Sequence, residues 1–185
     1  MISMPGPKKV ASEEIGKKGA RTVMQEGKVQ VARYRADYRA DFERLNLEWI
    51  EKYFEVEEPD LKSLKDPEKY ILEPGGEIFF VVENGIVKGT CALMRHTAER
   101  YELTKMAVTS GSQGRGYGNM LMEAIIHEAR EKGAKELFLL SNTVLVPAIR
   151  LYEKYGFWTV RIGTHSEYKR ANIEMMLDLS RKLLG

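Results

Sequence analysis

The chain has 185 residues, of which 43% are hydrophobic and 30% are charged. This length favours one domain with a single core. The composition is typical of a soluble globular protein, and no apolar run is long enough to span a bilayer. With 29 Lys and Arg against 27 Asp and Glu, the formal net charge is only +2. Composition therefore argues against a membrane role and against a globally basic, nucleic-acid-binding surface.

The first 28 residues differ in composition from the rest of the chain. They are rich in Gly, Lys, Glu and Ser and show no sustained apolar period, so they cannot bury much surface. We predict a flexible tail over residues 1–28 and one domain over residues 29–185. Prolines and lysines stand where a secretory signal would be apolar, which indicates a cytoplasmic protein. Contact of the tail's lysines with an acidic partner, nucleic acid included, is a minor hypothesis.

The single cysteine, Cys91, lies in an apolar run and is interpreted as a small buried strand residue. One cysteine excludes disulfides within the chain. His96 ends the same apolar strand, and His127 falls on a polar helix face, so neither has the partners of a metal ligand. We expect no metal site.

The first periodic segments follow the tail. Val29 to Arg33 is predicted to be a short strand, and Asp37 is a candidate cap for a helix. The next stretch, Glu57 to Asp66, is predicted to be a polar connection with a helical turn. The helix after Asp37 would place four large side chains on one face: Phe42, Leu45, Trp49 and Tyr53.

A hairpin and a strand come next. Glu77 to Glu83 and Ile86 to Arg95 alternate around Asn84-Gly85, which is a strong hairpin signal. Tyr101 to Val108 is predicted to be a further strand, followed by the glycine-rich loop Thr109 to Gly118. The loop leads into an amphipathic helix whose apolar face carries Leu121, Ile125 and Ala129.

The C-terminal part repeats this alternation. Leu137 to Leu140 is predicted to be a strand, and a helix runs from Pro147 to a stop at Gly156. Strands Phe157 to Ile162 and Asn172 to Leu179 complete the pattern. The order of elements predicts a mixed α/β sheet.

The glycine-rich loop reads Gln113-Gly114-Arg115-Gly116-Tyr117-Gly118-Asn119 and stands between a strand and a helix. Glycine amides at a helix N-terminus suit an anion such as a pyrophosphate. The alternative is a tight turn in which the glycines serve packing alone. A nucleotide-hydrolysing loop would need a lysine after its last glycine, and a dinucleotide loop would need a differently placed third glycine, so neither pattern fits.

The loop resembles motif A of the GNAT superfamily of N-acetyltransferases, with Gln113, Gly116 and Gly118 at the signature positions. Glu102 to Val108 looks like the strand before that motif. Asn142 and the stretch Ala148 to Phe157 resemble motif B. The resemblance covers about Val29 to Leu179 and implies a mixed, mostly antiparallel sheet flanked by helices on both faces.

The resemblance also implies a cosubstrate, acetyl-CoA, and its contacts. The strand backbone would pair with the pantetheine arm, the loop amides would bind the pyrophosphate, and Arg115 would add a charge-assisted bond. Asn142 would lie near the pantetheine, although it is equally a common loop residue. The implied cofactor-binding residues are Met106, Ala107, Val108, Gln113, Gly114, Arg115, Gly116, Tyr117, Gly118, Asn119, Asn142 and Tyr152.

Two catalytic residues follow from the same resemblance. Tyr152 matches the tyrosine that protonates the departing thiolate, and Glu102 matches a glutamate that deprotonates the incoming amine. Alternatives stay open, namely a core tyrosine at 152 and ordered water as the base. The backbone N–H of Val108 would stabilise the oxyanion.

The acceptor is expected to be a primary amine on a small molecule or a peptide. A cluster near the C-terminal end is a candidate acceptor pocket, although a solvated hairpin is an equal alternative: His165, Tyr168, Arg170 and Asn172. Leu137 stands where members that acetylate ribosomal proteins tend to carry a glutamate, which weakens that acceptor assignment.

The predicted function is therefore an acetyl-CoA-dependent N-acetyltransferase that works by direct attack of the amine. A homodimer is compatible with the sequence. The alternative is a non-catalytic acyl-CoA sensor or partner-binding module that retains the loop and lacks a productive acid and base.

Overall fold

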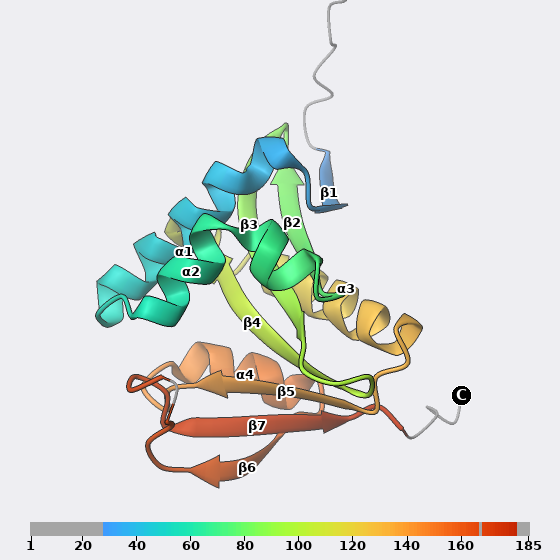
Figure 1. Ribbon diagram of the computed structural model, residues 1–185. Helices are drawn as coiled ribbons and strands as arrows, with labels where there is room; N and C mark the ends of the chain where they lie inside the picture. The colour runs from blue at the N-terminus through green and yellow to red at the C-terminus, as the bar shows by residue number, and fades with distance from the viewer. Residues whose placement is uncertain (1–27, 167, 181–185) are drawn as a thin grey trace, which may run out of the picture.

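The computed structural model describes residues 28–166 and 168–180, and the predicted tail up to residue 27 lies outside them. Within this part of the chain, seven strands form one sheet in the order β1-β2-β3-β4-β5-β7-β6 (Figure 1). Neighbouring strands are antiparallel except β4 and β5, which are parallel. The strands are β1 Val29–Arg33, β2 Glu77–Glu83, β3 Ile86–Arg95, β4 Arg100–Val108, β5 Glu136–Ser141, β6 Trp158–Ile162 and β7 Ile173–Asp178.

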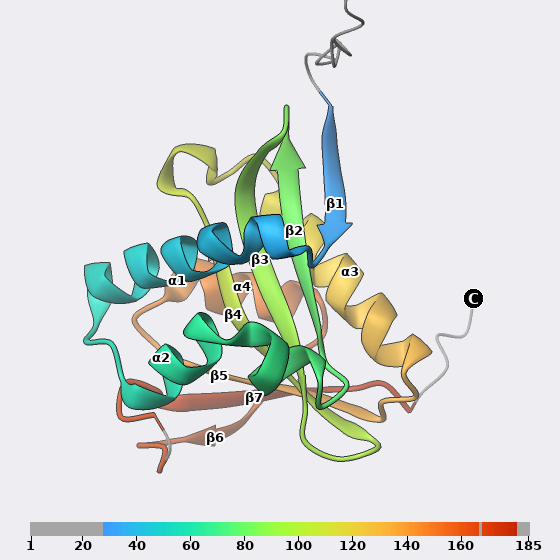
Figure 2. The ribbon, with the colours of Figure 1, turned by 45° about the horizontal axis from the view of Figure 1, so that its top comes forward.

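Helices cover both faces of the sheet, which confirms the predicted fold class (Figure 2). Four α-helices are described: α1 Arg39–Tyr53, α2 Glu58–Lys65, α3 Tyr117–Glu131 and α4 Val146–Lys154. Three short helical turns join them: η1 Ala36–Tyr38, η2 Glu68–Leu72 and η3 Ser110–Ser112. Among these described helices, none is long and apolar enough to cross a membrane.

The hairpin β2–β3 shows how the two faces are built. Its turn is Asn84-Gly85, as predicted, with both residues at positive φ. Successive side chains of a strand point to opposite faces. Phe79 and Val81 therefore pack against α3, whereas Ile78 and Phe80 pack against α1. The core thus consists of two apolar layers, one on each side of the sheet.

The N-terminal helices correct one sequence prediction. Asp37 lies inside η1, and α1 begins at Arg39 after Tyr38, with no side-chain cap bond. The predicted Asp37 cap is therefore wrong, because the chain enters α1 directly from the preceding helical turn. In place of the expected helical turn after Glu57, the chain forms a full helix, α2. Its N-terminus carries a capping box between Glu57 and Asp60.

Strand β4 contains an irregularity that positions the site. Thr90 pairs with Ala107 and Ala92 pairs with Thr104, so β4 carries one extra residue between these pairs. Lys105 lies in this bulge at φ 52°. A bulge changes which face the following side chains point to. Leu103 and Met106 therefore both face the α3 layer although they are three residues apart.

Strands β4 and β5 pair only at their first residues. The register runs from Arg100 opposite Glu136 to Glu102 opposite Phe138 and stops there. Beyond Glu102, β5 continues to pair with β7 on its other side. The backbone of β4 from Leu103 onward therefore has no sheet partner on the β5 side, as pairing of this strand with a pantetheine arm would require.

Candidate active site

A pocket lies where β4 separates from β5. Its floor is formed by Glu102 to Met106 of β4, and one wall by residues 140–142 at the end of β5. Tyr152 of α4 closes the side nearest α3, while α1 and α2 close the opposite side. Residues 168–171, from the loop before β7, complete the wall. Six segments of the chain therefore meet where the sheet is open between β4 and β5.

The side of the pocket nearest α2 is held by a buried ionic cluster. Asp60 of α2 is fully buried and accepts a hydrogen bond from Lys105 Nζ at 2.6 Å. Arg170 Nη2 donates to the same carboxylate at 2.8 Å, and its Nη1 reaches Glu57 at 3.1 Å. We call Glu57, Asp60, Lys105 and Arg170 the Asp60 cluster. It ties α2, the β4 bulge and the loop before β7 to one another.

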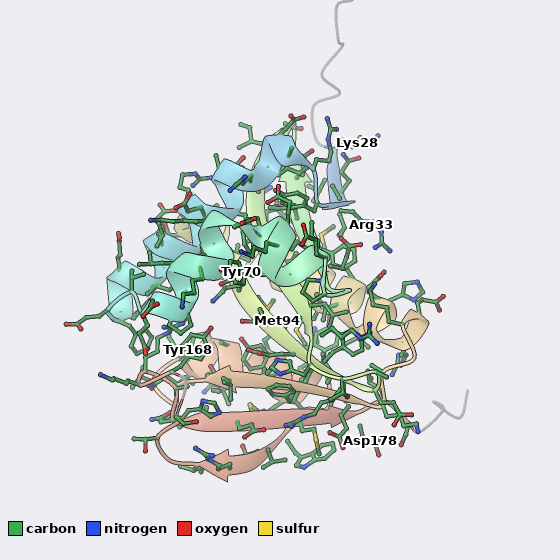
Figure 3. All side chains as sticks on the ribbon, viewed as in Figure 1. Lys28, Arg33, Tyr70, Met94, Tyr168 and Asp178 are labelled. Atoms are coloured by element: carbon green, nitrogen blue, oxygen red, sulfur yellow. The ribbon has the colours of Figure 1, made fainter. Side chains whose placement is uncertain are left out.

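Tyr168 covers this cluster. Its ring lies 4.7 Å from the Arg170 guanidinium carbon and 5.4 Å from Lys105 Nζ. Figure 3 shows Tyr168 between α2 and the layer of β5 and β7. An aromatic face attracts a cation, so both charges gain a further favourable contact.

The pKa values of the cluster reflect burial and pairing. Burial alone would raise the pKa of Asp60, but hydrogen bonds from Arg170 and Lys105 outweigh it, and the pKa is lowered overall. Burial lowers the pKa of Lys105, against the opposing effect of Asp60. A buried carboxylate with two cationic partners stays ionised, so the cluster holds the pocket wall as an ion network.

Glu102, the predicted base, lines the pocket with only 6% of its surface exposed. Its carboxylate is 2.9 Å from His96 Nε2. The His96 ring packs edge-on against Phe138, with centroids 5.0 Å apart. The His96 contact was not predicted, because the strand position of His96 suggested no partner. The histidine orients the carboxylate that faces into the pocket.

Tyr152, the predicted acid, lines the pocket from α4 and is 9% exposed. Its ring lies 6.1 Å from that of Phe157. Burial raises the pKa of Tyr152 to about 12. The side chain is both part of the core and part of the pocket wall, so the two interpretations made from the sequence are compatible in space.

The glycine-rich loop ends at α3. Gly114 and Gly116 adopt positive φ, and a Cβ at either would meet nothing within 4 Å. Gly116 precedes the first residue of α3, Tyr117. The backbone is therefore open in front of the helix N-terminus, as an anion site requires. Gly118 differs, because a Cβ there would lie 3.0 Å from Leu151, so this glycine serves helix packing.

The side chains of the loop have partners within the protein. Arg115 is bonded to Glu83 and lies 5.1 Å from the Tyr117 ring centroid. Tyr117 is 3% exposed and belongs to the core. Asn119 accepts a hydrogen bond from Lys154 at 2.5 Å. Backbone amides, rather than these side chains, are therefore what the loop presents.

Asn142 lies at the end of β5 and lines the pocket. Its amide nitrogen donates to the Arg170 carbonyl at 2.6 Å, and its amide oxygen accepts from the Val144 N–H at 3.0 Å. Both groups thus bind protein backbone. The residue fastens the Arg170 loop to the end of β5, which gives it a structural role as well as a place in the pocket.

The predicted acceptor cluster is only partly assembled. Tyr168 and Arg170 line the pocket, whereas Asn172 bonds to Thr143 outside it and His165 does not line it. Asp60 and Lys105 were not predicted as site residues, because they lie 45 residues apart in the chain. Cys91 is fully buried, as expected, and burial raises its thiol pKa well above the usual value. Among the described residues, no group of acidic, His or Cys side chains could hold a metal.

Comparison with known proteins identifies relatives. The chain is 28% identical over 81 residues to mycothiol acetyltransferase of Corynebacterium glutamicum (44% of this chain, 28% of that protein). It is 32% identical over 105 residues to N-acetylaspartate synthetase of Rattus norvegicus (56% of this chain, 35% of that protein). The chain thus spans about a third of the length of these two relatives.

Solved structures show the same fold. An acetyltransferase of the GNAT family from Staphylococcus aureus superposes with a TM-score of 0.75 at 20% identity, covering 82% of this chain and 99% of that one. The acetyltransferase YncA from Salmonella typhimurium, solved with acetyl-CoA, gives 0.65 at 18% identity, covering 84% and 96%. The profile of the acetyltransferase (GNAT) family matches residues 42–157. This match spans well over half of the chain, which therefore belongs to the acetyltransferase (GNAT) family.

Proposed function

We propose that this protein transfers an acetyl group from acetyl-CoA to a primary amine by direct attack. The observation that carries the proposal is the separation of β4 from β5 after Glu102, with the glycine-rich loop at the end of β4 and Tyr152 facing the opening. This arrangement supports the proposal, because the candidate base Glu102 and the candidate acid Tyr152 line one pocket and the candidate anion-binding loop follows directly after β4.

The residues present fit the cosubstrate. Gly114 and Gly116 leave room for a pyrophosphate in front of α3, where the helix dipole favours negative charge. The β4 backbone from Met106 to Val108 has no β5 partner, so the polar groups on that edge of the strand are available to an amide-containing arm. The family membership and the acetyl-CoA in the related YncA structure support the same choice.

Each catalytic group has one task. Glu102 takes a proton from the ammonium, directly or through water, because only the neutral amine has a lone pair. The amine nitrogen then bonds to the thioester carbon, and the Val108 N–H donates to the carbonyl oxygen as negative charge develops there. The carbon–sulfur bond breaks with its electron pair on sulfur, and the nitrogen loses its second proton to water, leaving a neutral acetamide and a thiolate.

Tyr152 acts on that thiolate. A phenol with a pKa of about 12 is a weaker acid than a thiol, whose usual pKa is about 8.5. Full proton transfer is therefore uphill. Tyr152 contributes mainly by donating a hydrogen bond to the sulfur while the bond breaks, and it stays protonated at neutral pH.

The first test is calorimetric titration with acetyl-CoA of the wild type and of Gly116→Glu. A glutamate at 116 brings negative charge and bulk to the loop, so binding should weaken at least about 100-fold. Gly133→Glu is the matched control, since Gly133 also has positive φ and nothing within 4 Å of its Cβ position, but follows the other end of α3. The control should bind normally.

The outcomes separate the candidate functions. Binding with turnover of some primary amine supports the transferase. Normal binding with no acetyl transfer to any amine in a broad panel would instead support the acyl-CoA sensor. Absence of wild-type binding would overturn both.

A further inference from the structure

We infer that the acceptor is a primary amine attached to an aromatic or similarly large apolar group, and that it carries no carboxylate. The inference rests on the proposed function and names the substrate class for the same pocket. It follows from what lines the α1 side of the pocket, from the pairing of its cations and from the position of Glu102.

The α1 side of the pocket is aromatic. Trp49 and Phe54 line it, with ring centroids 5.9 Å apart, and Ile50 lies between them in the sequence. Tyr53 extends the cluster, 6.4 Å from Trp49 and 6.3 Å from Phe54. Trp49 and Tyr53 also line a second hollow, together with Val108 and Gln113. A ligand in the pocket therefore meets the rings of Trp49 and Phe54.

The apolar face of α1 is buried at its start and exposed at its end. The first half of the helix buries Phe42 and Leu45 in the core, whereas Tyr53, at the end of the same face, is 48% exposed. Exposing large rings costs free energy unless something covers them. An apolar acceptor would cover Trp49 and Phe54 when it binds.

The cations in the pocket are already paired. Lys105 and Arg170 both bond to Asp60, and Arg170 also bonds to Glu57. The Asp60 cluster thus combines two cations with two carboxylates. A carboxylate on the acceptor would have to compete with Asp60 and Glu57 for these cations, and its desolvation would then be poorly compensated.

Glu102 favours a positive charge on the acceptor. Among the described residues that line the pocket, it is the one carboxylate outside the Asp60 cluster; it is hydrogen-bonded to His96, while the nearby Lys105 is bonded to Asp60. A single ammonium is attracted to this end. The pocket is therefore negative at Glu102 and apolar along α1, which suits a cation with one charge and an apolar body.

Three amines test the inference by release of the CoA thiol. 2-Phenylethylamine has the expected features, phenylalanine adds a carboxylate, and propylamine lacks the ring. We expect kcat/KM for 2-phenylethylamine to exceed that for phenylalanine by about 10- to 100-fold, because a charged group would be buried without a partner. It should exceed that for propylamine by a similar factor, from the lost apolar contact.

Variants of the two tryptophans test whether Trp49 causes the preference for an aromatic amine. Trp49→Ala should lower kcat/KM for 2-phenylethylamine about 10-fold, mainly through KM, while leaving propylamine within about 3-fold. Trp158→Ala is the matched control, because Trp158 is 44% exposed on β6 and lines neither hollow. It should change neither amine. Since the chain has two tryptophans, Trp158→Phe leaves Trp49 as the only one, and its fluorescence should change on addition of 2-phenylethylamine.

The results distinguish this inference from the proposed function. Equal or faster transfer to phenylalanine or propylamine would overturn the acceptor class while the transferase stands. An unchanged Trp49 signal at amine concentrations that give turnover would also overturn it. Binding of acetyl-CoA with no thiol release from any amine would overturn the proposed function itself.

Discussion

Two carboxylates in one pocket, Asp60 and Glu102, have opposite surroundings. Asp60 is fully buried and is bonded by Lys105 and Arg170. Glu102 is nearly as buried, at 6% exposure, but its neighbour is His96. Burial therefore does not distinguish the two groups; the number and kind of their partners do.

This difference distinguishes a carboxylate that stabilises the fold, Asp60, from the predicted base, Glu102. Protonating or removing Asp60 leaves two cations close together in a dry site, so its ionisation is coupled to the fold. Glu102 can gain a proton without leaving a lysine or arginine unpaired. A base must gain and lose a proton in each turnover, so the predicted role of Glu102 is compatible with its partners, whereas such a role for Asp60 would disrupt an ion network.

The largest expected effect on activity is that of Glu102→Gln. The amide keeps the size of the side chain but cannot accept the ammonium proton, so kcat/KM should fall by about 10²- to 10⁴-fold. Stability should change little, because His96 retains a hydrogen-bond partner. Steady-state kinetics at neutral pH, with thermal unfolding as the control, measures both. A loss smaller than about 3-fold would assign the base to ordered water.

The reverse pattern is expected for Asp60→Asn. This change leaves Lys105 and Arg170 without their shared counter-charge, which should cost about 3–5 kcal/mol of unfolding free energy. Urea unfolding measures the loss. Glu58→Gln is the control on the same helix, since the Glu58–Lys62 pair is exposed and should contribute nothing measurable. Wild-type stability in Asp60→Asn would show that the cluster does not hold the pocket wall.

The pH dependence of stability sharpens this contrast. The folded-state pKa of Asp60 is depressed, so its contribution is fully present above the unfolded-state value of about 3.9 and is lost as pH falls through the folded pKa. The stability gap between wild type and Asp60→Asn should therefore be constant from neutral pH to about pH 5 and close in more acidic solution. A gap that persists unchanged in acid would contradict the assignment.

Local patterns allowed most of the fold to be predicted. Asn84-Gly85 located the β2–β3 hairpin, and the glycine-rich loop predicted to end at Gly118 located α3, which begins at Tyr117, because turns and helix ends have strong local preferences. The bulge in β4 was missed although a signal existed. The apolar residues Leu103 and Met106 are three apart, which breaks the strict alternation of a regular strand.

The Asp60 cluster could not be predicted in the same way. Lys105 lies 45 residues from Asp60, and Arg170 lies 110 residues from it. An ion network between such distant segments has no local signature, and each residue alone reads as an ordinary surface charge. The assignments of Glu102 and Tyr152 depended on resemblance to a family, and their catalytic roles stay predictions.

The smallest of the expected effects on activity is that of Tyr152→Phe. Tyr152 differs from both carboxylates, because it is a buried acid that stays neutral. Tyr152→Phe should lower kcat about 10-fold through loss of one hydrogen bond to the thiolate. Because burial raises the pKa of Tyr152 to about 12, this loss should be the same at every pH from 6 to 9. For the same reason, ionisation of Tyr152 should not lower the kcat of the wild type in this pH range. Above about pH 10 the unfolded tyrosine ionises while the folded one does not, so stability declines there and assays should stop below it.

Tyr70→Phe, at a 38% exposed position outside the pocket, is the control. A Tyr152→Phe rate within about 2-fold of wild type would leave Tyr152 as a core residue, and the Glu102 side of the pocket would then carry the proton chemistry of the reaction.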